Sequence, residues 1–178
     1  AVTALVHNTC VITGGPGTGK TTVVQTILDT FVQAQPKKDG ILLCSPTGRA
    51  AKRLSETTGY PASTVHKAFG LWSEDGKEAG GAEQKLDLVI LDESSMLDMW
   101  LAAQVITRIS PETKLVLVGD AAQLPSVGPG NVLRDMIESR AFPVVKLTKI
   151  FRQAAESDIV VNAHRIHGGE RIDLAKRS

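Results

Sequence analysis

The stretch VITGGPGTGKTTVV, residues 11–24, decides the fold, because it sets a glycine-rich loop between an apolar run and a helical pattern. Gly14, Gly19, Lys20 and Thr21 fit the pattern G-x-x-x-x-G-K-[ST] in full. In such a loop the backbone curls so that several N–H groups point inward, and the following helix adds the positive end of its dipole. A glycine-rich turn without a ligand is the alternative. The lysine, the hydroxyl and the strand–helix context together favour a phosphate-binding loop.

The loop and the first helical turn are predicted to hold ATP. Lys20 reaches the β- and γ-phosphates in such loops, and the hydroxyl of Thr21 is suited to coordinate Mg²⁺. The predicted nucleotide-binding residues are Gly15, Pro16, Gly17, Thr18, Gly19, Lys20, Thr21 and Thr22.

Apolar runs and helical patterns alternate along the rest of the chain. The runs, nearly continuous as in buried parallel strands, are residues 9–13, 40–45, 86–92, 113–120 and 142–148. The helical patterns are residues 20–35, 48–59, 63–70 (with Ser63 as N-cap), 94–110, 130–140 and 155–168. This alternation predicts an α/β fold, a parallel sheet with helices on both faces, in one domain over residues 1–178. Residues 73–85 are polar and glycine-rich, which predicts a flexible loop or a short inserted hairpin.

Composition narrows the class of protein. The formal net charge of +1 is too small to indicate nucleic acid or a membrane surface by itself. Cys10 and Cys44 lie in apolar runs, which favours buried reduced thiols over a disulfide or a metal site. No apolar stretch approaches the roughly 20 residues of a membrane span, and no signal peptide opens the chain. We therefore expect a cytoplasmic protein with no membrane partner.

Two further strands end in chemistry-bearing residues. LVILDESS delivers Asp92 and Glu93 at the carboxyl end of a strand, where open α/β sheets place their sites. Asp92 is predicted to hold Mg²⁺, and Glu93 to orient and deprotonate the attacking water. A solvated acidic pair is the alternative. Asp120 ends the next strand, and Gln123 follows three residues later. A neutral amide near the γ-phosphate can donate to the phosphate and contact the water, so Gln123 is predicted to sense whether ATP or ADP is bound. An ordinary turn residue is the alternative by composition alone.

Six ordered motifs carry a resemblance to a known family. They are ITGGPGTGKTT, SPTGRAAKRL, ASTVHKAFG, LDESSMLD, GDAAQLPSVGPG and LTKIFRQ. Their order and spacing resemble superfamily 1 DNA helicases, most of all the RecD-like branch that includes the exodeoxyribonuclease V alpha subunit. The resemblance covers residues 4 to 170 or so. It implies the first RecA-like domain of an ATP-dependent motor that moves 5′ to 3′ on single-stranded DNA in repair or recombination, with nuclease or recombination subunits as possible partners.

The resemblance also assigns residues. Lys20, Glu93 and Gln123 match catalytic positions, and Arg152 in FRQ matches the arginine that contacts the γ-phosphate from the same domain. A guanidinium suits that place because its fixed fork of donors meets charge on a transferred phosphoryl group.

Two motifs match the segments that touch single-stranded DNA in this family. The predicted contacts are Ser45, Pro46, Thr47, Gly48, Arg49, Thr64 and His66. Hydroxyls, loop N–H groups and the cations Arg49, Lys52 and Arg53 can bind phosphate oxygens, and an imidazole can stack on a base. The alternative for the three cations is the solvated face of a helix.

Four other residues are given ordinary roles. Trp72 and Trp100 are expected to pack rather than stack on bases. His164 and His167 are expected to be solvated or to cap, because no suitably spaced cysteine or carboxylate completes a metal site.

Two departures from the family are visible. The adenine-reading glutamine that precedes AVTAL in the family is not in this sequence, and 178 residues leave no room for the second RecA-like domain. We therefore expect the first domain of a longer helicase that hydrolyses ATP weakly by itself. Two alternatives remain open, a self-contained P-loop NTPase that does not act on DNA and a module whose nucleotide is structural.

Overall fold

A six-stranded parallel sheet forms the centre of the molecule in the computed structural model, which describes residues 1–38, 40–71, 85–149 and 158–171. The strand order is β3-β2-β4-β5-β1-β6. The strands are β1 (Thr9–Gly14), β2 (Ile41–Ser45), β3 (Ala62–Thr64), β4 (Leu88–Leu91), β5 (Lys114–Gly119) and β6 (Val144–Leu147). Because all neighbouring pairs are parallel, the carboxyl ends of the strands meet at one edge of the sheet.

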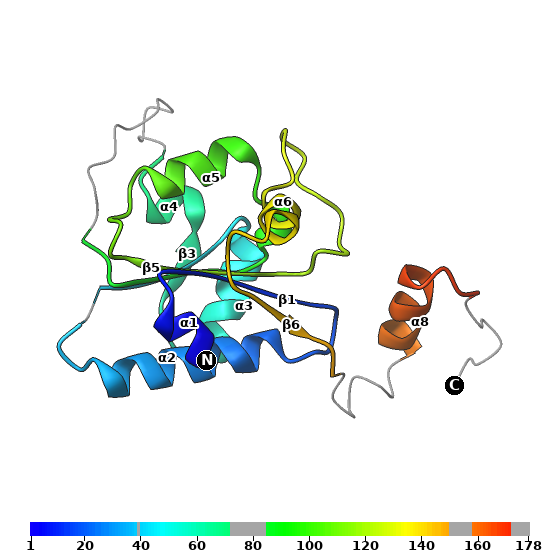
Figure 1. The fold of residues 1–178 in the computed structure, drawn as a ribbon, viewed down its shortest axis with the longest axis horizontal. Coiled ribbons are helices and arrows are strands. Elements are labelled where there is room, and N and C mark those ends of the chain that lie inside the picture. The colour runs from blue at the N-terminus through cyan, green and yellow to red at the C-terminus, as the bar shows by residue number, and fades with distance from the viewer. Residues whose placement is uncertain (39, 72–84, 150–157, 172–178) are drawn as a thin grey trace.

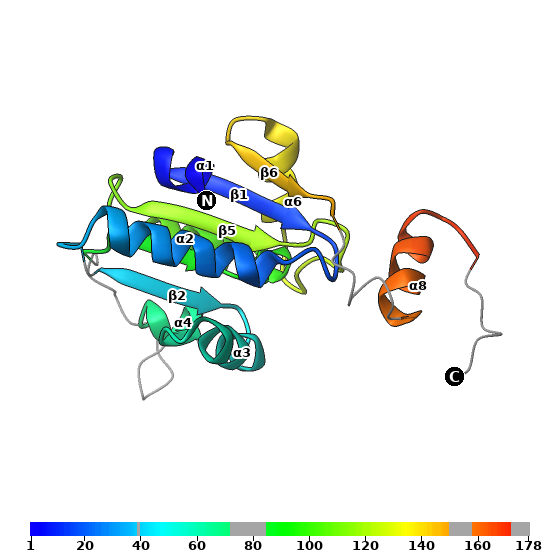
Figure 2. The same ribbon diagram turned by 90° about the horizontal axis from the view of Figure 1, so that it is seen from below.

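Helices cover both faces of this sheet (Figure 1). One face carries α1 (Val2–Val6), α2 (Lys20–Ala34) and α3 (Gly48–Thr58), and in Figure 2 α2 runs along the strands. The other face carries α4 (Val65–Ala68), α5 (Met99–Ile106) and α6 (Val132–Ser139), with a 3₁₀ turn η1 at Ser94–Met96. The last described helix, α8 (Asp158–His167), stands apart from these layers in both views.

Two apolar clusters, one on each face, hold the layers together. Ile12, Phe31 and Ile90 belong to the cluster under α2, and Val89, Leu101 and Leu133 belong to the cluster under α5 and α6. Strand β4 is buried at all four positions, which is why its sequence LVIL shows no polar alternation. The predicted α/β sheet with helices on both faces is confirmed.

The element boundaries differ from the sequence prediction at three places. Residues 63–70 begin as the short edge strand β3, and Thr64 rather than Ser63 caps the helix by accepting from the backbone N–H of Lys67. Residues 94–110 are not one helix, because Asp98 caps a new helix after η1. The helix at residues 2–6 was not predicted. Most of the predicted loop 73–85 lies outside the described residues.

Both cysteines agree with the prediction. Cys10 and Cys44 are free and buried, and burial raises the pKa of the Cys44 thiol to about 12. In the described part of the chain, no helix is long and apolar enough to cross a membrane.

Phe31→Ala is expected to destabilise the fold by about 3–5 kcal/mol, since it removes a fully buried ring between α2 and the sheet. Val32→Ala, on the exposed side of the same helix, is the matched control and is expected to change stability by less than about 0.5 kcal/mol. Urea unfolding of the two variants measures the difference. Equal midpoints would show that Phe31 does not pack as described.

Candidate nucleotide-binding site

The glycine-rich loop leaves β1 and turns into α2 at the carboxyl edge of the sheet. Gly17 and Gly19 have φ angles of 74° and 80°, in the left-handed region that glycine tolerates best. Gly14 is needed for space, because a Cβ there would lie 2.6 Å from the hydroxyl of Thr18 and 2.9 Å from Leu147. The spacing of glycines in the motif therefore follows from the backbone of this loop.

Lys20 folds back over the loop. Its Nζ donates to the carbonyl oxygens of Gly14 at 2.7 Å and Gly15 at 3.1 Å, while the hydroxyl of Thr18 donates to Gly15 at 2.8 Å. The ammonium group therefore lies at the mouth of the loop, at the amino-terminal end of α2. Its charge and the helix dipole both favour an anion at this place.

Asp92 and Glu93 follow β4 as predicted. Burial raises the pKa of Asp92, although the backbone N–H of Glu93, Lys20 and Arg53 act in the opposite direction. Burial, and then the neighbouring Asp92, raise the pKa of Glu93, while Lys20 and Arg53 lower it. Glu93 also holds a left-handed backbone with φ 52°, which is uncommon for a residue other than glycine and is concentrated at functional sites.

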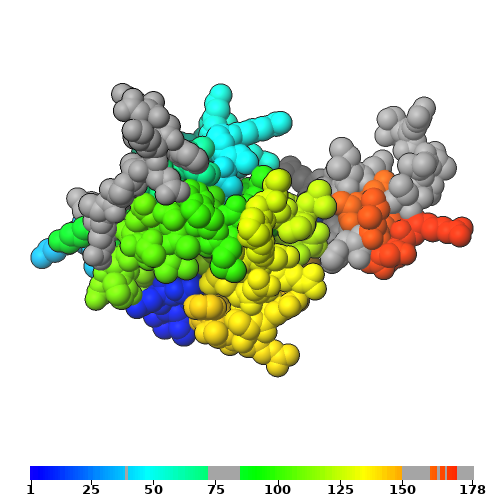
Figure 3. Space-filling model, turned by 90° about the horizontal axis from the view of Figure 1, so that it is seen from above, coloured from blue at the N-terminus to red at the C-terminus, as the bar shows by residue number. Residues whose placement is uncertain are grey.

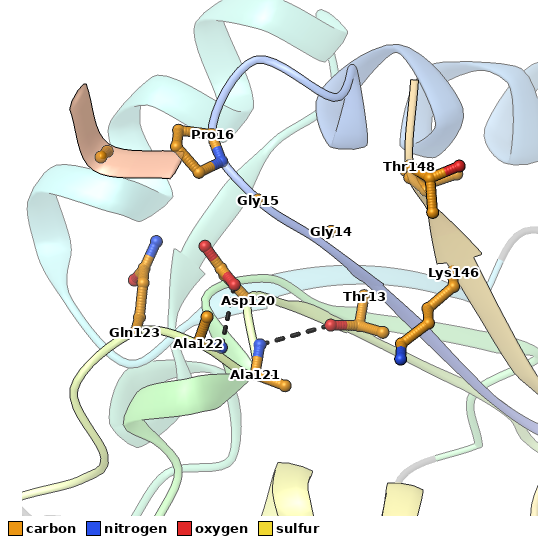
Figure 4. A pocket seen from close by; sticks show the side chains of 12 residues that line it. Thr13, Gly14, Gly15, Pro16, Asp120, Ala121, Ala122, Gln123, Lys146 and Thr148 are labelled. Carbon is orange, nitrogen blue, oxygen red and sulfur yellow. Dashed lines mark hydrogen bonds between the residues drawn. The ribbon is translucent and has the colours of Figure 1, made fainter. Parts of the chain in front are cut away.

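Asp120 and Gln123 belong to the loop after β5, and Figure 4 shows their side chains pointing toward the glycine-rich loop. Asp120 is buried, and its carboxylate accepts from the backbone N–H of Ala122 at 3.0 Å. Thr13 on β1 accepts from the backbone N–H of Ala121 at 3.3 Å. These two bonds tie the loop that carries Gln123 to the strand that leads into the glycine-rich loop.

A cavity of about 700 Å³ brings these groups together. Its lining residues are Pro16, Gly17, Thr18, Gly19, Lys20, Thr21, Thr22, Ala50, Arg53, Leu54, Asp92, Glu93 and Gln123. Gly15 lines an adjoining cavity of about 480 Å³, shown in Figure 4, which shares Pro16 and Gln123 with the first. The described site residues predicted for nucleotide, metal and catalysis thus lie around two neighbouring cavities.

The sequence profile of a family described as AAA domain matches residues 1–177. The chain belongs to this AAA-domain family.

Relatives of known function confirm the RecD-like resemblance of this AAA domain. It is 39% identical over 164 residues to the ATP-dependent RecD2 DNA helicase of Deinococcus radiodurans, covering 92% of this chain and 22% of that protein. It is 35% identical over 161 residues to the RecBCD enzyme subunit RecD of Mycolicibacterium smegmatis, covering 78% of this chain and 29% of that protein. The chain therefore spans less than a third of either relative.

Solved structures agree with the AAA domain in fold. The Pif1 helicase of Candida albicans matches with a TM-score of 0.66 at 22% identity, over 95% of this chain and 42% of that one. Unliganded Pif1 from Bacteroides sp. matches with a TM-score of 0.57 at 24% identity, over 88% of this chain and 41% of that one. The RecA-like P-loop fold inferred from the sequence is confirmed.

The predicted DNA contacts of the AAA domain occupy the edge of the sheet next to the cavity. Pro46 and Thr47 are half-buried, whereas Gly48 and Arg49 are exposed at the start of α3, whose side chains project in Figure 3 (cyan). Thr47 caps α3 by accepting from the backbone N–H of Ala50 at 3.3 Å. This end of α3 can therefore present donors to a phosphate chain.

Ser45 is completely buried at the end of β2, and its hydroxyl oxygen has no hydrogen-bond partner among the described residues. In this conformation its side chain is not exposed to solvent, so the structure adds no support for the predicted contact of Ser45 with DNA, which stays a prediction.

Thr64 and His66 lie beside each other at the start of α4. The Thr64 hydroxyl serves as the helix cap, and the imidazole of His66 stacks on Trp100 with ring centroids 6.2 Å apart. Trp100 packs against the apolar cluster under α5, so its predicted packing role is confirmed.

Trp72 and Arg152 lie outside the described residues, as do the side chains of His164 and His167.

Arg53 lines the nucleotide cavity of the AAA domain, a position that the sequence does not predict for it. The sequence groups it with Arg49 and Lys52 as a candidate DNA-binding cation. Its spacing of four residues from Arg49 puts both on one side of α3, which is the only signal that the sequence offered.

Proposed function

We propose that this chain is the ATP-binding motor domain of a DNA helicase that moves on single-stranded DNA, 5′ to 3′ by its resemblance to the RecD-like branch. One observation carries the proposal, namely that a single cavity collects Lys20 and Thr21 from the glycine-rich loop, Asp92 and Glu93 from β4 and Gln123 from the β5 loop. A phosphate cradle, paired carboxylates and a neutral amide at one edge are the parts that ATP hydrolysis requires.

The donor set fits Mg²⁺, and Thr21 and Asp92 would hold it. Hydroxyl and carboxylate oxygens are the ligands that this ion prefers. No group of three or more histidines, cysteines or carboxylates forms a metal cage within the described ranges, in keeping with an ion that retains water and binds phosphate oxygens. When bound, the ion neutralises charge on the phosphates.

The protein's own groups have distinct roles in this proposal. The backbone N–H groups of residues 15–22 and the ammonium of Lys20 bind and orient the phosphates. Glu93 takes the proton of the attacking water. Its pKa is raised, and a general base works best when its pKa lies near the working pH. Gln123, which lines both cavities, contacts the terminal phosphate and the water.

We propose further that this site is one half of a motor site completed by a second RecA-like domain. In support, the chain spans 22% of the Deinococcus radiodurans relative and 29% of the Mycolicibacterium smegmatis one. Roles in repair or recombination, alongside nuclease or recombination subunits, are suggested by the second relative, which is a RecBCD enzyme subunit. Arg152 is proposed to contact the γ-phosphate from this domain.

Binding of single-stranded DNA tests the nucleic-acid half of the proposal. We expect a fluorescent oligo(dT) to bind this chain at low salt and to dissociate as salt rises, because phosphate contacts release counterions. Arg49→Ala is expected to weaken binding and to lower the log–log salt slope by about 0.7, the loss of one single-strand phosphate contact.

The matched control for Arg49→Ala is Lys37→Ala, an exposed cation beyond the carboxyl end of α2. Its anisotropy titration is expected to overlay that of the unmodified chain. Absence of binding at low salt, or binding that ignores salt, would contradict a DNA-acting domain and favour a self-contained P-loop NTPase.

A further inference from the structure

Arg53 occupies an unusual place for a surface cation. It projects from the middle of α3 into the cavity that holds the glycine-rich loop, and it shares that cavity with Asp92 and Glu93. Its neighbour Lys52 is also exposed but forms an ion pair with Glu56 at 3.8 Å. Among the described residues no salt bridge engages Arg53, so its guanidinium is available to the cavity.

The topology explains how α3 reaches this cavity. Strand β2 pairs with β4 through the register Cys44↔Leu91, and the backbone N–H of Asp92 donates to the carbonyl of Cys44 at 2.9 Å. The helix that follows β2 is thereby placed beside the residues that follow β4. Ala50, Arg53 and Leu54 are the residues of α3 that line the cavity, together with residues of the glycine-rich loop.

The charge balance of the cavity favours one ligand for Arg53. Two carboxylates face the site at the end of β4, and Lys20 is the other cation that lines it. A terminal phosphate of ATP adds negative charge beside those carboxylates, whereas ADP lacks that group. A planar fork of donors meets phosphate oxygens better than a point charge does.

We propose that Arg53 binds the terminal phosphate of ATP and thereby makes the position of α3 depend on whether a triphosphate or a diphosphate is bound. This inference rests on the proposed ATP-binding function. Arg49, one turn earlier on the same helix, is a proposed DNA contact, so α3 links the phosphate to the DNA edge. By linkage, the triphosphate and the strand then alter each other's affinity to the same degree.

Calorimetric titration of this chain with Mg²⁺ and either ADP or the β,γ-imido analogue of ATP tests the phosphate contact. Arg53→Ala is expected to weaken binding of the imido analogue about tenfold, the loss of a charge-assisted hydrogen bond, and to leave ADP affinity within about twofold. Arg53→Lys keeps the positive charge but lacks the fork of donors, so its affinity for the imido analogue is expected to lie between those of the unmodified chain and Arg53→Ala. Lys37→Ala, an exposed cation beyond the carboxyl end of α2, is the matched control and should bind both nucleotides normally.

Two results would overturn this assignment. Equal loss of ADP and analogue affinity in a folded Arg53→Ala chain, checked by circular dichroism, would make its role structural. If Arg53→Ala binds the analogue with unchanged affinity while Lys20→Ala binds both nucleotides more weakly, Arg53 does not contact the phosphate, but the proposed function still holds. If Lys20→Ala binds both nucleotides with unchanged affinity, the proposed function itself is wrong.

Oligo(dT) affinity tests the link through α3. In the unmodified chain it is expected to differ between saturating imido analogue and saturating ADP, and in Arg53→Ala the two affinities are expected to converge. A difference that persists in Arg53→Ala would show that another element carries the link.

Discussion

Lys20→Ala is expected to weaken binding of both ATP and ADP by about 100-fold or more, because it removes the cation at the mouth of the glycine-rich loop. The ammonium Nζ of Lys20 donates to two loop carbonyls, at Gly14 and Gly15. A phosphate would replace those neutral acceptors with charged ones, and charge-assisted hydrogen bonds are about twice as strong. Calorimetry or fluorescence titration with Mg²⁺–ADP measures the loss.

The control for Lys20→Ala is Lys37→Ala, which removes the same charge at the far end of α2. That variant is expected to bind nucleotide like the unmodified chain, which separates a local contact from a change in net charge. Nucleotide affinity that survives Lys20→Ala in a folded chain would show that the loop binds no phosphates.

Glu93→Gln is expected to slow ATP hydrolysis roughly 10² to 10⁴-fold while nucleotide binding is retained. The amide keeps the size of the side chain but cannot accept the proton of the attacking water. Single-turnover hydrolysis, with the protein in excess over ATP, measures this effect even where steady-state turnover is slow.

Glu56→Gln is the matched control for Glu93→Gln, since Glu56 lies exposed on α3 and pairs with Lys52 outside the cavity. Its single-turnover rate is expected to equal that of the unmodified chain. A Glu93→Gln chain that binds and hydrolyses ATP at the unmodified rate would exclude Glu93 as the base.

The sequence predicts the central strands of the sheet well because they are buried on both faces. Runs such as LVIL in β4 lack polar positions, so their strand character is visible without any knowledge of neighbours. The order of the strands is not visible in this way. Local patterns do not say that β2 lies beside β4, and that pairing is what carries α3 and Arg53 to the nucleotide cavity.

The boundary errors have local causes. The apolar residues from 94 to 110 suggest one helix, but Glu93 adopts a left-handed backbone and Asp98 caps a second start, so the segment divides. Ser63 and Thr64 are both capable caps, and the three-residue strand β3 is too short to show a period.

Some site residues can be recognised from the sequence, and others cannot. Lys20 and Asp92 sit in motifs whose residue types fit phosphate and Mg²⁺ binding, whereas Gln123 is singled out by the family pattern. The structure brings all three to one cavity. Ser45 ends a predicted strand and also begins a motif that resembles a DNA-contacting segment, and the structure buries its side chain at the end of β2. Burial of a small polar group is decided by the neighbouring strands and not by its own segment.

Steady-state hydrolysis of Mg²⁺–ATP by this chain, with and without an excess of single-stranded oligonucleotide, tests the central claim most directly. Lys20→Ala supplies the blank. We expect turnover barely above that blank in both conditions, because a half-site without its second domain lacks several kcal/mol of transition-state stabilisation. Brisk turnover that ignores DNA and disappears in Lys20→Ala would contradict the motor-domain account and make the chain a self-contained NTPase.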